Sequence, residues 1–353
     1  MSLDFLKNNG ARRIREFDPQ PQLLTENIPM SEDENECVDL EYETKHDWKP
    51  RCVQGAEYSD AAEMPRRFVD GKDVGRVVAW LQSEGGSPVP IRVSEIGAAC
   101  LRSHQTENGE TGLMREWSQV ERVVSLMTDL FPWDEVEEFA GALSEVGFRL
   151  LPVLLREDEW HDGFLWDFER TRKRTHDRSK DEMIRCEREA LSRDFDAPTI
   201  VDGNLDMRAS AFAPDAHVVG IIKSHYRNYL GAQGWRTFYE LEPCQRTPAF
   251  TIGCKNLEVV SWYVRLDGAN GEMPNFGIVR VETPRAFFEN VMGKDFDYMD
   301  RVSRLICKYR CRDEGYGRAS VTIHPIRRVE ESLGALMTNS DTLISRFYRL
   351  TGL

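Results

Sequence analysis

The stretch Pro198-Thr199-Ile200-Val201-Asp202-Gly203-Asn204-Leu205-Asp206 decides the predicted fold. A β-branched run of this kind is typical of a buried strand. It ends at Asp202, and Gly203 lets the backbone turn directly after it. The stretch therefore predicts a buried strand that delivers a carboxylate to the edge of a sheet.

An earlier stretch, Arg67-Phe68-Val69-Asp70-Gly71-Lys72-Asp73, repeats this design. Two strand ends of this kind would bring Asp70 and Asp202 together at one sheet edge. Clustered carboxylates repel each other unless a cation lies between them, and oxygen ligands favour magnesium or manganese. Asp-Gly is also the commonest hairpin signal, so each pair taken alone more often marks a plain turn.

Composition sets the broad class. The 353 residues are 41% hydrophobic and 30% charged, as in a water-soluble globular protein with a substantial core. No apolar run approaches the roughly 20 residues of a membrane span, and residues 1–7 have no signal-peptide core. The eight scattered cysteines contain no Cys-x-x-Cys pair, which argues against zinc and favours reduced thiols. We therefore expect a cytoplasmic protein without a membrane partner.

The order of predicted elements indicates an α/β fold. Residues 1–63 read as a partly irregular N-terminal arm, and residues 64–353 as one domain with a helical insertion at about 115–193. Strands are predicted at 67–69, 74–82, 89–101, 148–155, 218–222, 250–254, 259–266 and 277–282, and helices at 159–193, 285–312 and 325–337. An antiparallel meander, a helix and then a parallel strand form the ground plan of an RNase H-like mixed sheet flanked by helices.

Five stretches in this order resemble the NurA nuclease family, the partners of the HerA-type DNA-translocating ATPase. They are Phe68-Val69-Asp70-Gly71, Val201-Asp202-Gly203-Asn204-Leu205, Val219-Gly220-Ile221-Ile222-Lys223, Trp262 to Leu266 with Gly277 to Glu282, and Gly315-Tyr316 with Ile323-His324. The resemblance covers roughly residues 64–345. Lys72 stands where the family has a small hydroxyl residue, and Gly317 where it has proline.

The resemblance implies a metal-dependent DNA nuclease with an RNase H-like fold. It implies exonuclease activity on DNA ends, endonuclease activity on single strands and the use of two Mn²⁺ (or Mg²⁺) ions. It also implies a homodimer docked on a HerA-like hexameric ATPase, in DNA end processing or in anti-phage defence. The alternative is a catalytically inactive RNase H-like scaffold that regulates the motor.

Asp70 and Asp202 are the expected central metal ligands. The third carboxylate is expected from the helix before Asp202, where the family carries a glutamate. Glu187 fits best, with Glu182 and Glu189 as the alternatives, because only one helix face can look at the sheet. Phosphodiester hydrolysis between two metal ions needs such ligands to hold them.

Other side chains are expected around these acids. Lys223 ends an apolar strand and either contacts a phosphate or extends to solvent. His324 precedes a Pro-initiated helix and binds the second metal, transfers a proton or makes a structural hydrogen bond. Glu282 is either a fourth acid or a strand-end partner of Arg280. Lys72, beside Asp70, either binds substrate phosphate or competes with the metal.

The candidate DNA contacts lie outside this group. The formal charge is 46 − 60 = −14, which opposes nucleic-acid binding by the surface as a whole. The run 170–180 is locally basic, and Arg172, Lys173 and Arg174 are either DNA contacts or part of a solvated helix face. Tyr226 and Tyr229, with Arg227 between them, interleave aromatic rings with a cation, which suits both single-strand stacking and ordinary packing.

Overall fold

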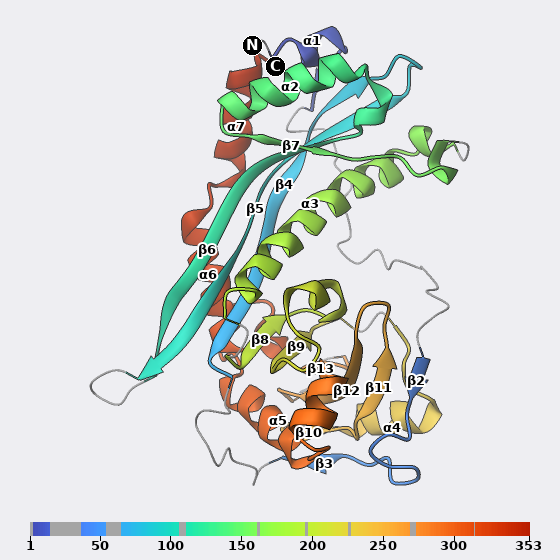
Figure 1. Cartoon of the computed structure of the whole chain (residues 1–353), viewed down its shortest axis with the longest axis vertical. Coiled ribbons are helices and arrows are strands. Elements are labelled where there is room, and N and C mark those ends of the chain that lie inside the picture. Colours follow the sequence, from blue (N-terminus) through green and yellow to red (C-terminus); the bar gives the residue numbers. More distant parts are fainter. Residues whose placement is uncertain are drawn as a thin grey trace.

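The computed structural model describes residues 3–14, 37–53, 65–105, 111–160, 163–194, 197–224, 227–268, 273–313 and 315–353. They form a mixed sheet flanked by helices, which confirms the α/β class (Figure 1). The main strand order is β2 (Cys37–Asp39), β11 (Phe250–Gly253), β12 (Glu258–Arg265), β13 (Ile278–Pro284), β9 (Val218–Ile222), β8 (Thr199–Asp202), β4 (Arg67–Gln82), β5 (Pro88–Gln105), β6 (Thr111–Leu126) and β7 (Arg149–Pro152). Beside this path, β1 (Arg12–Arg13) pairs with β4, and β10 (Gln245–Arg246) pairs with β12 and β3 (Arg51–Cys52).

The meander of β4, β5 and β6 is antiparallel, as predicted, but its strands are much longer. The expected break at Asp70-Gly71 is wrong, because β4 runs unbroken through both residues. They pair with Ala99 and Ala98 of β5, and the ladder continues on either side. Continuous pairing with the neighbouring strand prevents the Asp-Gly pair from turning.

The prediction of helical structure from residue 115 is also wrong for residues 115–126, which belong to strand β6. Val123 packs with Ile96 and Leu151 on one face of the sheet, and Val124 packs into a second cluster on the other. A strand that is covered on both faces loses the alternation that identifies strands in a sequence. The spacing of its valines therefore resembles the spacing of apolar residues on a helix.

A short parallel section follows. β8 pairs in parallel with β4 and with β9, and Val69 lies opposite Val201. The next residues along these two strands are Asp70 and Asp202. This register places both carboxylates side by side, as the sequence predicted.

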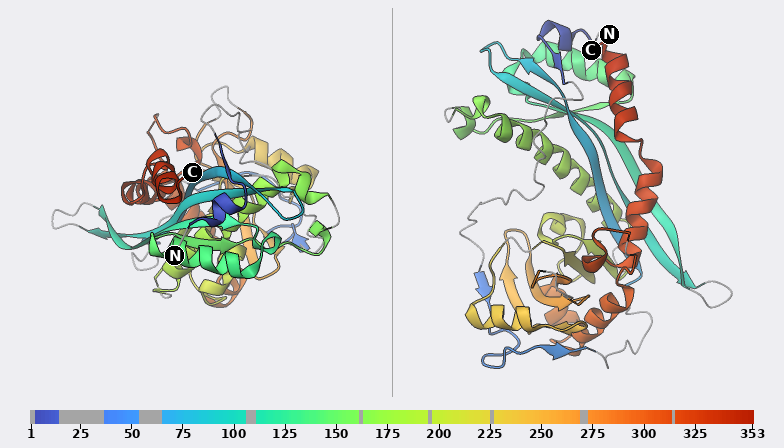
Figure 2. Two further views of the ribbon diagram at one scale, coloured as in Figure 1. Left: turned by 90° about the horizontal axis from the view of Figure 1, so that it is seen from above. Right: turned by 180° about the vertical axis from the view of Figure 1, so that it is seen from behind.

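Helices cover both faces of the sheet (Figures 1 and 2). α3 packs through Ala190 and Leu191 against Val69 and Val201 on one face. α6 packs on the other through Ile326, Val329 and Leu333, against a cluster that includes Phe68 and Ile200. The described helices are α1 (Phe5–Asn8), α2 (Trp133–Glu145), α3 (Phe168–Leu191), α4 (Ala232–Glu240), α5 (Asp297–Tyr309), α6 (His324–Leu336) and α7 (Ser340–Thr351), with short turns η2 (Thr128–Leu130), η3 (Asp158–Trp160), η4 (Phe164–Trp166), η5 (Asp206–Ala211), η6 (Phe287–Val291) and η7 (Ala319–Val321).

Two helix predictions need correction. The helix expected at 159–193 begins only at Phe168, where the Asp167 side chain accepts hydrogen bonds from two backbone amides of its first turn. The helix expected at 285–312 is divided into the π-helical turn η6 and α5. Gly293, with φ +61°, allows the reversal between them.

The described parts of residues 1–63 belong to the fold. Phe5 and Leu6 are buried in the cluster beneath α2, while β1, β2 and β3 extend the sheet. The remaining residues of this segment lie outside those described. Within the described ranges, none of the helices combines the length and apolar character needed to cross a membrane.

Candidate metal centre

Three carboxylates meet beside the parallel strands: Asp70 of β4, Asp202 at the end of β8 and Glu330 of α6. One oxygen from each lies within 4.8 Å of the others. The parallel register aligns the two aspartates, and Gly203, with φ +115°, turns the chain away after Asp202. We call Asp70, Asp202 and Glu330 the carboxylate trio.

Lys223 reaches the trio from the strand next to β8. Its Nζ lies 2.7 Å from Oδ2 of Asp202 and 3.9 Å from Oε1 of Glu330. The Tyr316 hydroxyl donates a 2.6 Å hydrogen bond to the other oxygen of Glu330. Burial alone would lower the pKa of Lys223, but the carboxylates of Asp202 and Asp70 outweigh it and raise that pKa. Lys223 is therefore a cation held by the trio.

One ammonium does not balance three carboxylates. Asp70 is only 6% exposed, and burial, together with the charge of Asp202, holds its pKa well above the usual range. Lys223 opposes that shift without cancelling it. Three converging carboxylates with a charge deficit are a donor set that a divalent cation such as Mg²⁺ or Mn²⁺ prefers. The residues present therefore fit the expected kind of metal.

Glu187, the expected third ligand, is not part of the trio. A Cβ built on Gly71 would lie 2.7 Å from Oε1 of Glu187. Because successive strand residues point to opposite faces, Glu187 covers the face of β4 opposite to the Asp70 side chain. Its carboxylate pairs with Arg208 of η5 at 2.5 Å. Burial raises its pKa, and the nearby charge of Asp202 adds to the shift while Arg208 opposes it. Glu187 thus influences the trio through the sheet without joining it.

The alternatives Glu182 and Glu189 do not join the trio either. Glu182 pairs with Arg149 at 2.7 Å and Arg178 at 3.0 Å, and Glu189 pairs with Arg185. These partners fix all three α3 glutamates in ion pairs. The expectation that α3 supplies the third carboxylate is therefore corrected in favour of α6.

Glu330 was missed although the sequence carries a signal for it. It lies four residues after Ile326 and three before Leu333, in a predicted helix whose apolar residues form one face. A carboxylate beside that face is directed toward the sheet rather than away from it. An acid on the apolar side of an amphipathic helix is the pattern that could have identified it.

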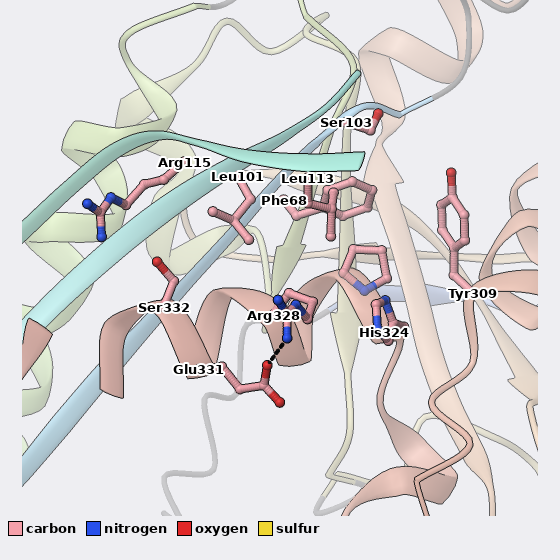
Figure 3. A pocket seen from close by; sticks show the side chains of 11 residues that line it. Phe68, Leu101, Ser103, Leu113, Arg115, Tyr309, His324, Arg328, Glu331 and Ser332 are labelled. Atoms are coloured by element: carbon pink, nitrogen blue, oxygen red, sulfur yellow. Dashed lines mark hydrogen bonds and ion pairs between the residues drawn. The ribbon is translucent and has the colours of Figure 1, made fainter. Parts of the chain in front are cut away.

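His324 lies apart from the trio. It is exposed on the first turn of α6 and lines a cavity of about 520 Å³ with Phe68, Tyr309 and Arg328 (Figure 3). Glu331, the residue after Glu330, lines the same cavity and bonds Arg328. Consecutive helical residues point in different directions, so the cavity is on another side of α6. His324 is thus not placed as a ligand beside the three acids.

Lys72 and Glu282 have separate surroundings. Gly334 lies one helical turn after Glu330 in α6, and a Cβ built on it would lie 3.6 Å from the Lys72 ammonium. Glu282 accepts a 2.6 Å hydrogen bond from the Leu205 amide and pairs with Arg280 at 2.9 Å. Glu282 is therefore a structural partner that holds the chain after β8. The ammonium that meets the acids is Lys223.

The candidate DNA contacts on α3 are paired with acids. Arg172 lies 3.6 Å from Glu169, Lys173 bonds Asp177 at 2.6 Å, and Arg174 lies 3.3 Å from Glu159. Their positive charge is therefore largely compensated within the protein, which favours the interpretation as a structured helix face.

The second set of candidate DNA contacts follows β9. Tyr226 lies outside the described residues, and Arg227 is half-buried between β9 and α4. The neighbouring Tyr229 has the Arg280 guanidinium 5.0 Å from its ring centroid. For Tyr229, ordinary packing is the arrangement observed.

Comparison of the chain with protein-family models gave no match, and comparison with curated proteins gave none either.

Proposed function

We propose that the protein is a metal-dependent nuclease that hydrolyses DNA phosphodiester bonds at the carboxylate trio. The observation that carries the proposal is the convergence of Asp70, Asp202 and Glu330 within 4.8 Å, where the parallel pairing of β4 with β8 ends. The order β6–β5–β4–β8–β9, with an antiparallel meander and then parallel strands, supports an RNase H-like core. DNA as the substrate rests on the sequence resemblance.

Each residue has a role in this proposal. The trio holds the metal, which when bound supplies an activated water and neutralises charge on the phosphate. Lys223, held by Asp202 and close to Glu330, is positioned to contact a phosphate oxygen of the substrate. The Tyr316 hydroxyl orients Glu330.

The resemblance also leads us to propose a larger assembly. A homodimer docked on a HerA-like hexameric ATPase would receive the DNA strand from the motor. The acidic net charge and the compensated α3 cations are consistent with weak binding of free DNA. Adding the motor to the assay should therefore increase cleavage.

The deciding experiment is a cleavage assay on labelled single-stranded and duplex DNA with manganese, magnesium or EDTA. Wild type should cut in manganese and stop in EDTA. Asp202→Asn should be inactive, while Asp206→Asn should remain active. Asp206 is the matched control because it belongs to the same stretch and instead caps the Asn256 amide at 2.8 Å. Equal activity of both variants would refute the proposed site.

One observation favours a second candidate, a catalytically inactive scaffold. The Lys223 ammonium already lies against two carboxylates of the trio, where it is able to substitute for a metal. A scaffold of this kind would neither bind manganese nor cut DNA. Calorimetric titration of wild type with manganese separates the two functions.

A further inference from the structure

Each aspartate of the carboxylate trio is followed by a glycine, and a buried charged side chain lies against each glycine. A Cβ built on Gly71 would lie 2.7 Å from Oε1 of Glu187 and 3.0 Å from two carbons of the same side chain. A Cβ built on Gly203 would lie 3.1 Å from both terminal nitrogens of Arg208. The glycine after each aspartate thus leaves room for one of these side chains.

The two side chains are paired with each other. Oε2 of Glu187 lies 2.5 Å from Nη2 of Arg208, and the side chains are 1% and 6% exposed. Glu187 belongs to α3, which packs against both β4 and η5, and Arg208 belongs to η5. We call Glu187 and Arg208 the buried pair. Because water is excluded around it, salt screens this pair much less than it screens surface charges.

Arg208 also holds the turn that follows Asp202. Its Nη1 donates a 2.7 Å hydrogen bond to the Asn204 carbonyl, and its Nη2 donates a 3.2 Å bond to the Asp202 carbonyl. Within the same turn, the Gly203 amide donates a 2.8 Å hydrogen bond to the Ile221 carbonyl of β9. The backbone at Asp202 is therefore fixed by a buried guanidinium as well as by the sheet.

The direct pairing of the two aspartate-bearing strands stops just before the aspartates. Val69 of β4 and Val201 of β8 are the last paired residues, and Asp70 and Asp202 come next. The separation of the two carboxylates therefore depends on contacts other than the pairing of β4 with β8.

We propose that Glu187 and Arg208 are positioning residues that hold the two aspartates at a fixed separation. The Glu187 carboxylate packs on Gly71, the residue after Asp70. The Arg208 guanidinium binds the Asp202 carbonyl. The buried pair joins these two contacts beyond the last paired residues of the strands. The inference rests on the proposed metal site, whose aspartate ligands the buried pair aligns.

The first test disturbs the buried pair without changing any charge. Gly71→Ala should displace the Glu187 carboxylate and weaken manganese binding by about 10-fold, within the range for groups that support metal ligands. Gly253→Ala in β11 is the matched control, because its Cβ would meet its nearest atom at 3.5 Å, an ordinary contact. Calorimetric titration measures both affinities. Wild-type affinity in Gly71→Ala would overturn the proposal.

The second test asks whether Gly71→Ala acts through Glu187. Glu187→Ala empties the space beside Gly71, so adding Gly71→Ala to it should change the manganese affinity by less than about twofold. An equal loss of affinity with and without the Glu187 side chain would mean that the substitution acts on Asp70 directly. That result would refute a connection through the buried pair.

The third test separates positioning from charge and from stability. Glu187→Gln and Glu187→Ala remove the same charge, but only glutamine keeps an oxygen beside Arg208. Glu187→Ala should therefore bind manganese about 10-fold more weakly than Glu187→Gln. Glu43→Ala is the stability control, because Glu43 is 2% exposed and pairs with buried Arg246 on β10, a strand without a trio residue.

Glu43→Ala should lower the Tm, as Glu187→Ala does, and keep the manganese affinity of wild type. Equal affinities of the two Glu187 variants, or the same loss in Glu43→Ala, would reduce the buried pair to a stabilising contact. If wild type binds no manganese, the proposed metal site itself fails. Thermal melts in EDTA then decide on the buried pair: Gly71→Ala should lower the Tm of wild type more than that of Glu187→Ala, and equal shifts would refute the contact.

Discussion

Two groups of three carboxylates in this protein have opposite electrostatics. The trio of Asp70, Asp202 and Glu330 shares the single ammonium of Lys223. A second group, the arginine-paired acids, comprises Glu121 of β6 with Glu182 and Glu189 of α3. Their partners are Arg149, Arg178 and Arg185.

Their pKa values shift in opposite directions. Burial and like charges raise the pKa of Asp70, whereas hydrogen bonds from arginines overcome burial and lower the pKa of Glu182 to about 2. A cluster of acids is therefore no sign of a metal site by itself. The deficit of cations in the trio is the feature on which the proposed metal site rests.

The largest expected difference concerns catalysis. Asp202→Asn should lower DNA cleavage by more than about 10³-fold, because the metal that supplies the nucleophile is no longer held. The rate in manganese, measured with labelled DNA, checks this. Asp70→Asn should have the same effect. Near wild-type cleavage by either variant would remove the functional distinction between the two acidic groups.

The next prediction compares the two faces of β4. Glu330→Gln should weaken manganese binding by about 10- to 100-fold, as expected for loss of a charged ligand or its close support. Glu187→Gln should change the manganese affinity by less than about threefold relative to wild type, because the Glu187 carboxylate is paired with Arg208. Calorimetric titration measures both. The reverse ranking would restore α3 as the source of the third ligand.

Removing the Lys223 ammonium should make the trio differ further from the arginine-paired acids. Its ammonium repels an incoming cation, so Lys223→Met should tighten manganese binding without DNA by about tenfold, or ~1.4 kcal/mol. Cleavage should fall, because the phosphate contact is lost. Lys255→Met, at an exposed turn, is the control. Weaker manganese binding in Lys223→Met would show that the ammonium supports the metal site instead.

Stability should depend on pH with opposite sign in the two groups. Asp70 has a raised folded-state pKa, so its ionisation destabilises the metal-free protein as pH rises above about 4, the unfolded value. Asp70→Asn should therefore raise the metal-free Tm at pH 7 by roughly 2–4 °C, with a smaller difference near pH 4.

Glu182 provides the matched contrast. Its folded-state pKa of about 2 lies below the ordinary value of 4.5, so it stabilises the fold above that value, and this contribution disappears as pH falls toward 2. Glu182→Gln should lower the Tm at pH 7 and approach wild type in acid. Thermal melts of both variants in EDTA check the signs. Two shifts of the same sign would contradict the electrostatic distinction.

The smallest effect is expected on the basic face of α3. Lys173→Gln should change the Kd for single-stranded DNA by less than about twofold at moderate salt, because Asp177 already compensates its charge. Fluorescence anisotropy with labelled DNA measures this. A more than tenfold loss of affinity for single-stranded DNA would show that Lys173 contributes to DNA binding.

Local sequence patterns predicted those features that depend on neighbouring residues. The buried strand that ends at Asp202-Gly203, the apolar strand before Lys223, the short strand β7 and the Pro-initiated helix α6 were all foreseen. Each is encoded by composition and by a turn or cap within a few residues. These features sufficed to predict an α/β class with two aspartates at one place.

Only the tertiary structure decided the features that depend on distant partners. Pairing with Ala98 and Ala99 keeps β4 extended through Asp70-Gly71, and pairing with β5 makes 111–126 a strand. Glu187 is paired with Arg208 and is therefore not a candidate ligand. The packing of α6 against β4 places Glu330 beside Asp70 and Asp202. Glu330 follows Asp70 by 330 − 70 = 260 positions in the sequence. No local pattern specifies which of many acids meets a given sheet edge, because strand register and helix packing determine that contact.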